Sequence, residues 1–399
     1  MAKVVKRFWT GQLYFAGDFS KQSYYKFCFF AVKLKLTMSK GKVLLCMSGG
    51  IDSSVAAMLL REEGYELHGL TYRPYDSISP ACMEKQTGCC SVDAIFEAKA
   101  LAYDLGFDHS VLDIRKEFDK TVISDFVKEY LAGRTPNPCV VCNRTIKWGE
   151  VITKANELGC DFIATGHYAR IGEKDGRYFL IRGKDESKDQ TYFLWQLSQS
   201  DLKRTIFPLG NLTKTEVRQI ALEKGYEKIS KKRESQEICF IPDNDYRRFI
   251  KERVPDLEQQ VGKGNFVDTN GKILGQHYGY PFYTIGQRKG LEIALGRPMY
   301  VVNIDPATNT VVLGDRSDLN KKELWVENLN LMKYENIEGE MEVLTKIRYN
   351  NKGTLSRISQ HDSRIRVEFY ENTWAVTPGQ SAVFYEGDDI VGGGIICKS

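Results

Sequence analysis

The feature that most constrains the fold is an alternation of short apolar runs with helix-like segments between Gly41 and about Arg233. The runs are short enough to be buried strands, and the segments between them carry apolar side chains at helical spacing. This alternation predicts an α/β domain with a parallel sheet and helices on both faces. Thr213 and Glu216 form a capping box for a further helix. We expect strands at 43–47, 67–72, 110–114 and 162–165, and helices at 54–63, 92–105, 118–131 and 146–158.

The character of the sequence changes after about Ile241. Glycine and aromatic residues become more frequent, helical periodicity weakens, and strand-like runs at 300–304 and 310–313 flank a turn. Short strands and turns continue to the C-terminus, which predicts a small β-barrel. We therefore divide the chain into a leader outside the core (1–37), the α/β domain (38–240), a small central domain (241–298) and a C-terminal β-barrel (299–399).

Positive charge is concentrated in the leader. Its 37 residues hold seven Lys or Arg and one Asp, a net charge of +6, whereas the whole chain carries +4 and the remainder therefore −2. Any RNA-binding surface on the body must then be a local patch. We interpret the leader as a translated stretch upstream of a start at Met38. The alternatives are an arm that contacts RNA or a membrane surface, and a transit peptide, which its single arginine disfavours.

The amino-acid composition indicates the cellular compartment in which the protein is expected. Apolar residues make up 42% and charged residues 27% of the chain, and no run approaches the roughly 18 apolar residues of a membrane span. Ten cysteines are scattered along the sequence, which favours a reducing compartment over a disulfide framework. We expect a cytoplasmic protein without a membrane partner.

A candidate phosphate loop occupies residues 48–54, Ser-Gly-Gly-Ile-Asp-Ser-Ser, between an expected strand and an expected helix. Two glycines bring backbone N–H groups to phosphate oxygens, and the helix N-terminus and serine hydroxyls add donors. Asp52 in such a loop implies Mg²⁺ between its carboxylate and the phosphates. The lysine of the GxxxxGK[ST] loop is absent. A serine-capped Gly-Gly turn is the alternative, and the strand–loop–helix setting favours nucleotide binding.

A Cys-x-x-Cys pair follows two prolines at 135–144, Thr-Pro-Asn-Pro-Cys-Val-Val-Cys-Asn-Arg. The prolines exclude helix before Cys139 and Cys142, so the thiols are presented from a constrained loop. We expect the nearby cations of Arg144 and Lys147 to lower the thiol pKa.

Cys239 is a second candidate for a reactive thiol, and it follows the basic run 231–233. For any of these cysteines the alternative is a small buried apolar residue, and the apolar neighbours of Cys239 give that alternative weight. Cys82, Cys89 and Cys90 suggest a metal site, but no spacing partner completes it.

Together the motifs resemble a known family. The loop at 48–54 carries the SGGxDS signature of the N-type ATP pyrophosphatases, which cleave ATP between its α and β phosphates and adenylylate a substrate oxygen. TPNPxxxCN, GHYAR, KDQTYFL, ESQEICFI, TIGQRKGL and TPGQ with AVFY then follow in order between Thr135 and Tyr385. So assembled, residues 42–397 resemble the tRNA-specific 2-thiouridylases of the MnmA type, which thiolate the wobble uridine of tRNA.

The resemblance implies an α/β ATP pyrophosphatase domain, ATP with Mg²⁺, and a role for each matching residue. Uridine O2 would be adenylylated and then replaced by sulfur from a persulfide on Cys239; Cys142 would be the nucleophile that can end in a disulfide with Cys239. ATP would be held by Cys46, Met47, Ser48, Gly49, Gly50, Ile51, Asp52, Ser53, Tyr72 and Gly166. Transfer RNA would be contacted by Asn137, Pro138, Cys139, His167, Lys188, Asp189, Gln190, Arg348, Tyr349 and Gln380.

The implied partners are tRNAs for Lys, Glu and Gln and a sulfur donor, such as a cysteine desulfurase or a sulfur relay protein. Clusters such as 247–248 and 288–289 would meet tRNA phosphates. Without the resemblance, His167 fits a core histidine equally well, residues 348–349 fit a surface strand, and Lys188 with Asp189 fits a solvated charge pair.

Cys139 departs from the family pattern, which has an aspartate there. With Cys142 and Cys239 it offers three thiolates that could hold an iron–sulfur cluster. We rank the persulfide route first, because the same three cysteines also serve as ordinary redox thiols. Two further hypotheses are a ligase that adenylylates a small molecule, for which the cysteines are dispensable, and an RNA-binding module with a vestigial loop.

Overall fold

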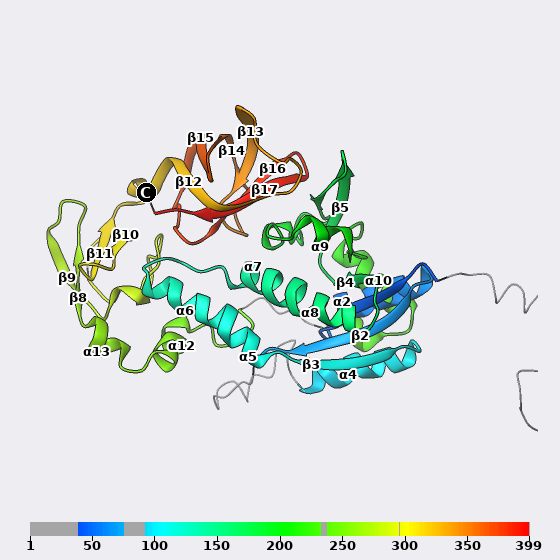
Figure 1. Ribbon diagram of the computed structural model, residues 1–399. Coiled ribbons are helices and arrows are strands. Elements are labelled where there is room, and N and C mark those ends of the chain that lie inside the picture. The colour runs from blue at the N-terminus through cyan, green and yellow to red at the C-terminus, as the bar shows by residue number, and fades with distance from the viewer. Residues whose placement is uncertain (1–38, 76–91, 233–237, 295, 399) are drawn as a thin grey trace, which may run out of the picture.

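A five-stranded parallel sheet forms the centre of the α/β domain, with strand order β3-β2-β1-β4-β7 (Figure 1). This arrangement confirms the fold predicted from the sequence. The computed structural model describes residues 39–75, 92–232, 238–294 and 296–398. The strands are β1 (Lys42–Cys46), β2 (Glu66–Arg73), β3 (Asp108–Asp113), β4 (Phe162–Ala164) and β7 (Thr205–Ile206).

Alternate residues of β1 face two different helical layers. Val43 and Leu45 are buried in one hydrophobic cluster, and Leu44 and Cys46 in another. Because the central strand is buried on both faces, its sequence is continuously apolar. The first cluster includes α2 (Ile51–Glu62), α4 (Val92–Asp104) and α10 (Lys214–Glu223), and the second includes α7 (Pro138–Cys142) and α8 (Val151–Glu157).

Local signals set the helix ends. Thr213 Oγ1 accepts the N–H of Glu216, and the Glu216 carboxylate accepts the N–H of Thr213, so α10 begins at the predicted capping box. Gly64, just after α2, has a φ of +91°, which favours glycine. The remaining helices of this domain are α5 (Arg115–Phe118), α6 (Ser124–Leu131), α9 (Gln199–Lys203) and α11 (Glu227–Ser230), with π-helical segments at Asp119–Ile123 and Asn143–Glu150.

The C-terminal part is a closed barrel with strand order β12-β15-β14-β13-β16-β17, and β12 pairs with β17 to close it. A hairpin of the α/β domain, β5 (Ala169–Lys174) and β6 (Arg177–Arg182), extends the barrel sheet at β17. The barrel is therefore tied to the α/β domain by strand pairing. Its strands are β12 (Asn320–Leu331), β13 (Glu340–Lys346), β14 (Thr354–His361), β15 (Arg364–Trp374), β16 (Ser381–Glu386) and β17 (Asp389–Ile396).

The central part holds a four-stranded sheet, order β10-β11-β8-β9. The division expected at residue 299 assigned the 300–314 hairpin to the barrel, whereas the structure pairs that hairpin with β8. The helices and strands of the central part are α12 (Tyr246–Arg253), α13 (Leu257–Val261), β8 (Gly264–Val267), β9 (Ile273–His277), β10 (Tyr300–Asp305) and β11 (Thr310–Gly314).

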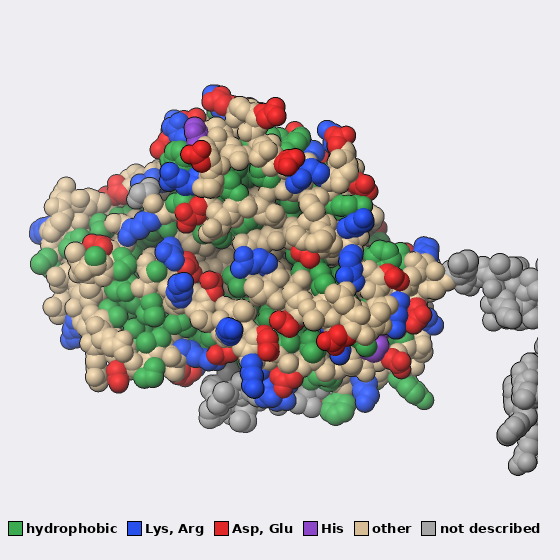
Figure 2. All heavy atoms as spheres, viewed as in Figure 1, with side chains coloured by type: hydrophobic (Ala, Val, Ile, Leu, Met, Phe, Trp, Pro, Cys, Tyr) green, Lys and Arg blue, Asp and Glu red, His purple; other side chains and the backbone are tan. Residues whose placement is uncertain are grey.

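On the face shown in Figure 2, Lys and Arg side chains are spread among acidic ones and form no single basic patch. Several of them lie in the band between the barrel and helices α6 to α8. Within the described ranges, every helix is too short or too polar to cross a membrane.

His277 makes the central part sensitive to acid. Its ring packs against Phe266 and Tyr283, with centroid distances of 5.0 and 5.3 Å, and desolvation lowers its pKa to about 4. Unfolded histidine titrates near 6.5, so the unfolded chain binds more protons between pH 6.5 and 4 and stability falls as the pH falls through that range.

We expect this histidine alone to reduce the free energy of unfolding by about 2 kcal/mol between pH 7 and pH 5. His277→Asn keeps an acceptor for the Gly279 N–H, which His277 Nδ1 accepts at 3.0 Å, but cannot titrate. Urea unfolding at both pH values should show a smaller pH dependence for the variant. An unchanged dependence would contradict the assignment.

Candidate active site

The loop between β1 and α2 is fastened by its own serines. Ser53 Oγ accepts the N–H of Ser48 at 3.2 Å and donates to the carbonyl of Gly50 at 3.2 Å. Gly49 has a φ of +69°, and a Cβ there would lie 2.5 Å from the carbonyl oxygen of Ala94. The turn therefore requires glycine at this position, and the expected strand–loop–helix setting is present.

Asp52 pairs with a residue that sequence analysis missed. Lys214 Nζ, from the first residue of α10, donates to both carboxylate oxygens at 2.8 and 2.9 Å, and Tyr168 Oη donates to one of them at 2.7 Å. The Lys214 side chain is only 10% exposed. An ammonium is thus held in the protein directly beside the phosphate loop.

Within the described residues, the possible metal ligands named from the sequence do not form a metal site by themselves. In the ranges that the structure describes, no three His, Cys, Asp or Glu side chains are grouped so that they could hold a metal ion. Asp52 offers one carboxylate, already bonded to an ammonium, and the thiols at 139, 142 and 239 form no cluster site. Cys82, Cys89 and Cys90 lie outside the described residues.

The other residues expected at ATP line the same end of the sheet. A Cβ on Gly166 would lie 2.9 Å from the backbone nitrogen of Ser53, so glycine lets the segment after β4 touch the loop. Cys46, Met47 and Ile51 are buried, so only their backbone can reach a ligand. Tyr72, in the last part of β2, is half-buried.

Lys147 connects His167 with the thiols. Lys147 Nζ lies 3.2 Å from His167 Nε2, and Thr165 Oγ1 lies 2.7 Å from His167 Nδ1. Burial, reinforced by Lys147, lowers the His167 pKa well below its usual value, so the ring is neutral and accepts from Lys147 through Nε2. His167 is 9% exposed, which matches a satisfied core histidine better than a tRNA contact.

The thiols of α7 differ from expectation in one respect. Cys139 is exposed and Cys142 half-buried. We expected a lowered thiol pKa at this pair, but the surrounding protein raises the pKa of Cys139 by desolvation, and Lys147 only partly opposes this. Burial likewise raises the pKa of Cys46 to about 12, where Lys147 and Cys142 are its electrostatic neighbours. Cys46 and Val140, which lies between the two cysteines of α7, belong to one hydrophobic cluster, so α7 lies near the carboxyl end of β1.

Cys239 is exposed and is anchored by its neighbours. The Tyr75 hydroxyl donates to the Cys239 carbonyl, and the Phe240 ring packs against Phe126 at 5.3 Å. Phe240 and Phe126 belong to the hydrophobic cluster against which Cys142 also packs. The structure thus brings both thiol-bearing segments to one cluster. Residues 234–237 of the ESQEICFI motif lie outside the described ranges.

Several residues expected to contact tRNA make hydrogen bonds within the protein. Asp189 is 5% exposed, and its carboxylate accepts the N–H of Gly183 and the hydroxyl of Thr191. Gln190 Oε1 accepts the N–H of Tyr168 at 3.0 Å. Lys188 is half-buried beside them.

The proline loop before α7 is hydrogen-bonded to a residue of the C-terminal part. Gln380 Nε2 donates to the carbonyls of Pro136 at 2.7 Å and Thr135 at 3.2 Å. The Tyr349 ring packs on Phe193 at 4.5 Å, and Arg348 donates to the backbone at the end of β15. The α/β domain and the C-terminal part therefore both hold the loop that contains Asn137, Pro138 and Cys139.

Comparison with known proteins identifies the family. Three family models cover most of the chain: a tRNA methyl transferase HUP domain (41–243), a tRNA methyl transferase PRC-barrel domain (247–315) and an aminomethyltransferase beta-barrel domain (321–396). The tRNA-specific 2-thiouridylase MnmA of Cytophaga hutchinsonii is 52% identical over 361 residues, 90% of this chain and 98% of that protein. That of Amoebophilus asiaticus is 52% identical over 91% of this chain and 96% of its own length. The chain belongs to the tRNA-specific 2-thiouridylase family.

Solved structures with similar features are more distant. A 4-thiouridine synthetase in complex with RNA and ATP is 20% identical over 54% of this chain and 51% of that one, with a TM-score of 0.34. An NH3-dependent NAD synthetase from Campylobacter jejuni is 17% identical over 61% and 88%, with a TM-score of 0.30.

Two cations complete the site of this 2-thiouridylase family member, and sequence analysis assigned neither to it. Lys214 lies within the predicted capping box of Thr213 and Glu216, but its partner Asp52 is 162 positions away in the sequence. Lys147 was noted only as a neighbour of the Cys-x-x-Cys pair, whereas its hydrogen bond to His167 joins two segments. The capping box places a helix start at Lys214, but its burial and its partner Asp52 are set by the fold.

Proposed function

We propose that this chain replaces O2 of the tRNA wobble uridine with sulfur at the expense of ATP. The observation that carries the proposal is that α7, the helix of Cys142, shares a hydrophobic cluster with Cys46 at the carboxyl end of β1, where the phosphate loop begins. There Cys46, the last strand residue before the loop, is the electrostatic neighbour of Cys142 and Lys147. An adenylylated base bound there would face a sulfur nucleophile.

Activation comes first. Uridine O2 attacks the α-phosphorus of ATP, the bond to the β-phosphate breaks, and pyrophosphate leaves. The loop at 48–53 supplies backbone donors for the phosphates. Lys214, beside the loop, offsets the negative charge that builds up as pyrophosphate departs. The base then carries AMP, a far better leaving group than oxide.

Sulfur transfer follows. The terminal sulfur of a Cys239 persulfide attacks C2, AMP leaves, and the base is joined to Cys239 through two sulfurs. Cys142 thiolate then attacks Cys239 Sγ, the S–S bond to the base breaks, and 2-thiouridine is released with a Cys142–Cys239 disulfide. The implied partners are cytoplasmic tRNAs for Lys, Glu and Gln and a persulfide-bearing donor protein.

The proposal is tested with unmodified tRNA, Mg-ATP and persulfide-loaded enzyme, by digesting the RNA and detecting 2-thiouridine by mass. Product with one AMP and one pyrophosphate per thiolated base is expected. ATP turnover without tRNA would favour the small-molecule ligase instead. Binding of tRNA with no pyrophosphate release would favour the RNA-binding module.

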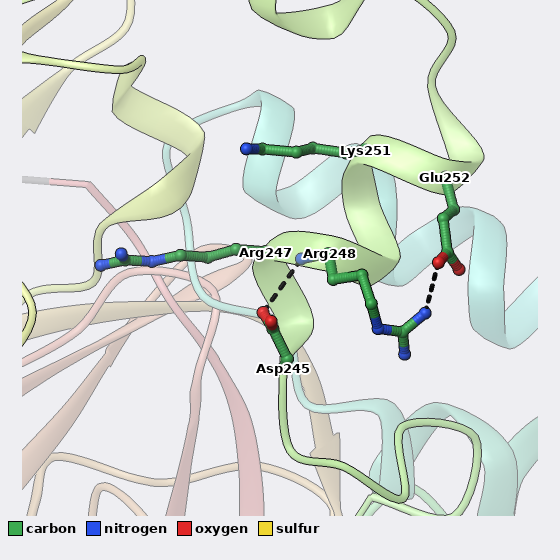
Figure 3. A pocket seen from close by; sticks show the side chains of 5 residues that line it. All are labelled: Asp245, Arg247, Arg248, Lys251 and Glu252. Atoms are coloured by element: carbon green, nitrogen blue, oxygen red, sulfur yellow. Dashed lines mark hydrogen bonds and ion pairs between the residues drawn. The ribbon is translucent and has the colours of Figure 1, made fainter. Parts of the chain in front are cut away.

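Helix α12 gives a test of the tRNA surface. A hollow there is lined by charged side chains, and Figure 3 shows Arg247 and Lys251 pointing away from Arg248 and Glu252. Arg248 is neutralised by Asp243 at 2.8 Å and Glu252 at 2.6 Å. The Arg247 guanidinium lies 5.2 Å from the Tyr283 ring centroid and donates to the carbonyl of Gly290 at 3.0 Å. Among the described residues no acidic side chain pairs with it, so its charge remains available to a phosphate.

We expect Arg247→Ala to weaken tRNA binding about threefold to tenfold and to lower the salt dependence by about one ion. Arg248→Ala on the same helix is the matched control: its affinity should change less than about twofold, while its thermal stability falls because two ion pairs are lost. Equal losses of affinity in both variants, measured by filter binding over a salt series, would contradict the assignment.

A further inference from the structure

Helix α7 carries two thiols one turn apart. Cys139 and Cys142 are three positions apart in this helix. Such positions lie on one side of an α-helix with Cα atoms about 5 Å apart, within the span of about 4.4–6.8 Å that disulfides bridge. Cys139 is exposed and Cys142 half-buried. The pair therefore has the spacing and the access of a redox Cys-x-x-Cys.

The helix is held firmly at both ends. The carbonyl of Asn137 accepts the N–H of Val140 at 3.1 Å, and Val140 itself is 1% exposed. Asn143 Nδ2 donates to the carbonyl of Phe193 at 2.9 Å. A disulfide between adjacent turns would thus form on a scaffold that is already ordered, with little further loss of entropy.

The proposed function creates a need for such a pair. Each turnover ends with Cys142 and Cys239 joined, and Cys239 can accept no new sulfur until that bond is opened. Cys142 packs partly against the hydrophobic cluster, which limits access for an external reductant. Cys139 lies on the same helix and is exposed.

We propose that Cys139 is the resolving cysteine that frees Cys239 after each turnover, a role that rests on the proposed function. The Cys139 thiolate attacks Cys142 Sγ, a Cys139–Cys142 bond forms, the Cys142–Cys239 bond breaks, and Cys239 leaves as a thiolate. The exchange is electron-neutral. A dithiol reductant then supplies two electrons and two protons to return Cys139 and Cys142 to thiols.

The exchange leaves Cys239 reduced and moves the disulfide to an exposed residue. Cys139 is exposed, so its bond to Cys142 is open to a dithiol reductant. Cys239, exposed on its own segment, is then available to a sulfur donor.

The first measurement needs no turnover. The full chain carrying Cys239→Ser is oxidised with glutathione disulfide over a range of ratios, alkylated with N-ethylmaleimide and mapped by mass spectrometry. One Cys139–Cys142 disulfide per molecule is expected. A bond from Cys142 to Cys46, or no bond from Cys142 under conditions that oxidise Cys397, would overturn the proposal.

The second measurement follows one turnover of persulfide-loaded enzyme without reductant. Wild type should show Cys239 alkylated and Cys139 joined to Cys142. Cys139→Ser should form the same single equivalent of 2-thiouridine but retain the Cys142–Cys239 disulfide, with multiple-turnover rates in glutathione about tenfold lower. Cys397→Ser, a half-buried thiol of the barrel, is the matched control and should behave as wild type.

A wild-type enzyme that retains the Cys142–Cys239 disulfide would overturn the inference, as would iron bound by all three cysteines after anaerobic purification. The absence of 2-thiouridine from every variant would instead refute the proposed function. The first measurement decides the Cys139–Cys142 pairing in either case, so the two failures are distinguishable.

Discussion

Cys239→Ser and Cys142→Ser are each expected to lower 2-thiouridine formation by at least about 10³-fold, with Mg-ATP affinity within about twofold of wild type. A serine oxygen cannot carry a persulfide, and it cannot attack a disulfide sulfur at neutral pH. Neither thiol is needed to cradle the triphosphate, because the loop fastens itself through Ser48, Gly50 and Ser53. Quantitative nucleoside mass spectrometry and equilibrium nucleotide binding measure the two quantities.

The two variants should fail at different steps. Cys239→Ser takes up no sulfane sulfur from a donor. Cys142→Ser loads sulfur and attacks the base once, which leaves tRNA linked to Cys239 through a disulfide. Dithiothreitol cleaves that disulfide and releases at most one equivalent of 2-thiouridine, so the rate is measured without added thiol. Cys397→Ser serves as the control and should retain full activity. If either site variant formed 2-thiouridine at more than about a tenth of the wild-type rate, the assigned roles would be untenable.

Local chemistry made much of the fold predictable. Val43 and Leu44 belong to a strand buried on both faces, which leaves a continuous apolar run in the sequence. Thr213 and Glu216 are three positions apart, so their reciprocal capping bonds are visible in the sequence. Gly49 occupies a turn that no side chain fits. Each of these features is decided by residues within a few positions of one another.

The features that the sequence did not predict depend on contacts between segments that are far apart in the chain. Asp189 looks like a solvated acid beside Lys188, yet the fold buries it with Thr191 as partner. The direction of the Cys139 pKa shift depends on how much protein surrounds the thiol, which a list of neighbouring cations does not reveal. The 300–314 hairpin has the composition of a barrel hairpin, and only its pairing with β8 assigns it to the central sheet.

Lys214 is the strongest of these long-range findings for function. Its ammonium is 10% exposed and bonds both oxygens of Asp52, whose backbone lies in the first turn of α2 directly after the loop. Burying this cation costs solvation, which the Asp52 carboxylate offsets in the resting protein, and the Tyr168 hydroxyl donates a further hydrogen bond to that carboxylate. A bound triphosphate would bring further negative charge within reach of the same ammonium.

We therefore expect Lys214→Met to slow release of pyrophosphate by about 10²–10³-fold, the range found when one preorganised donor to developing charge is removed. Rapid-quench measurement of pyrophosphate from enzyme, tRNA and Mg-ATP gives the rate. Lys184→Met is the matched control, since Lys184 is 49% exposed and pairs with Glu216 on the same helix. That variant should lose less than about twofold, as expected for an exposed ion pair.

Stability must be separated from catalysis, because Lys214→Met leaves Asp52 with one partner fewer. Tyr168→Phe also removes one hydrogen bond from Asp52 but leaves the cation in place. If Lys214 acts by its charge on the phosphates, Tyr168→Phe should lower the melting temperature while slowing pyrophosphate release less than about tenfold. Equal rate losses in both variants would show that Lys214 only positions Asp52, and a wild-type rate in Lys214→Met would remove it from the site altogether.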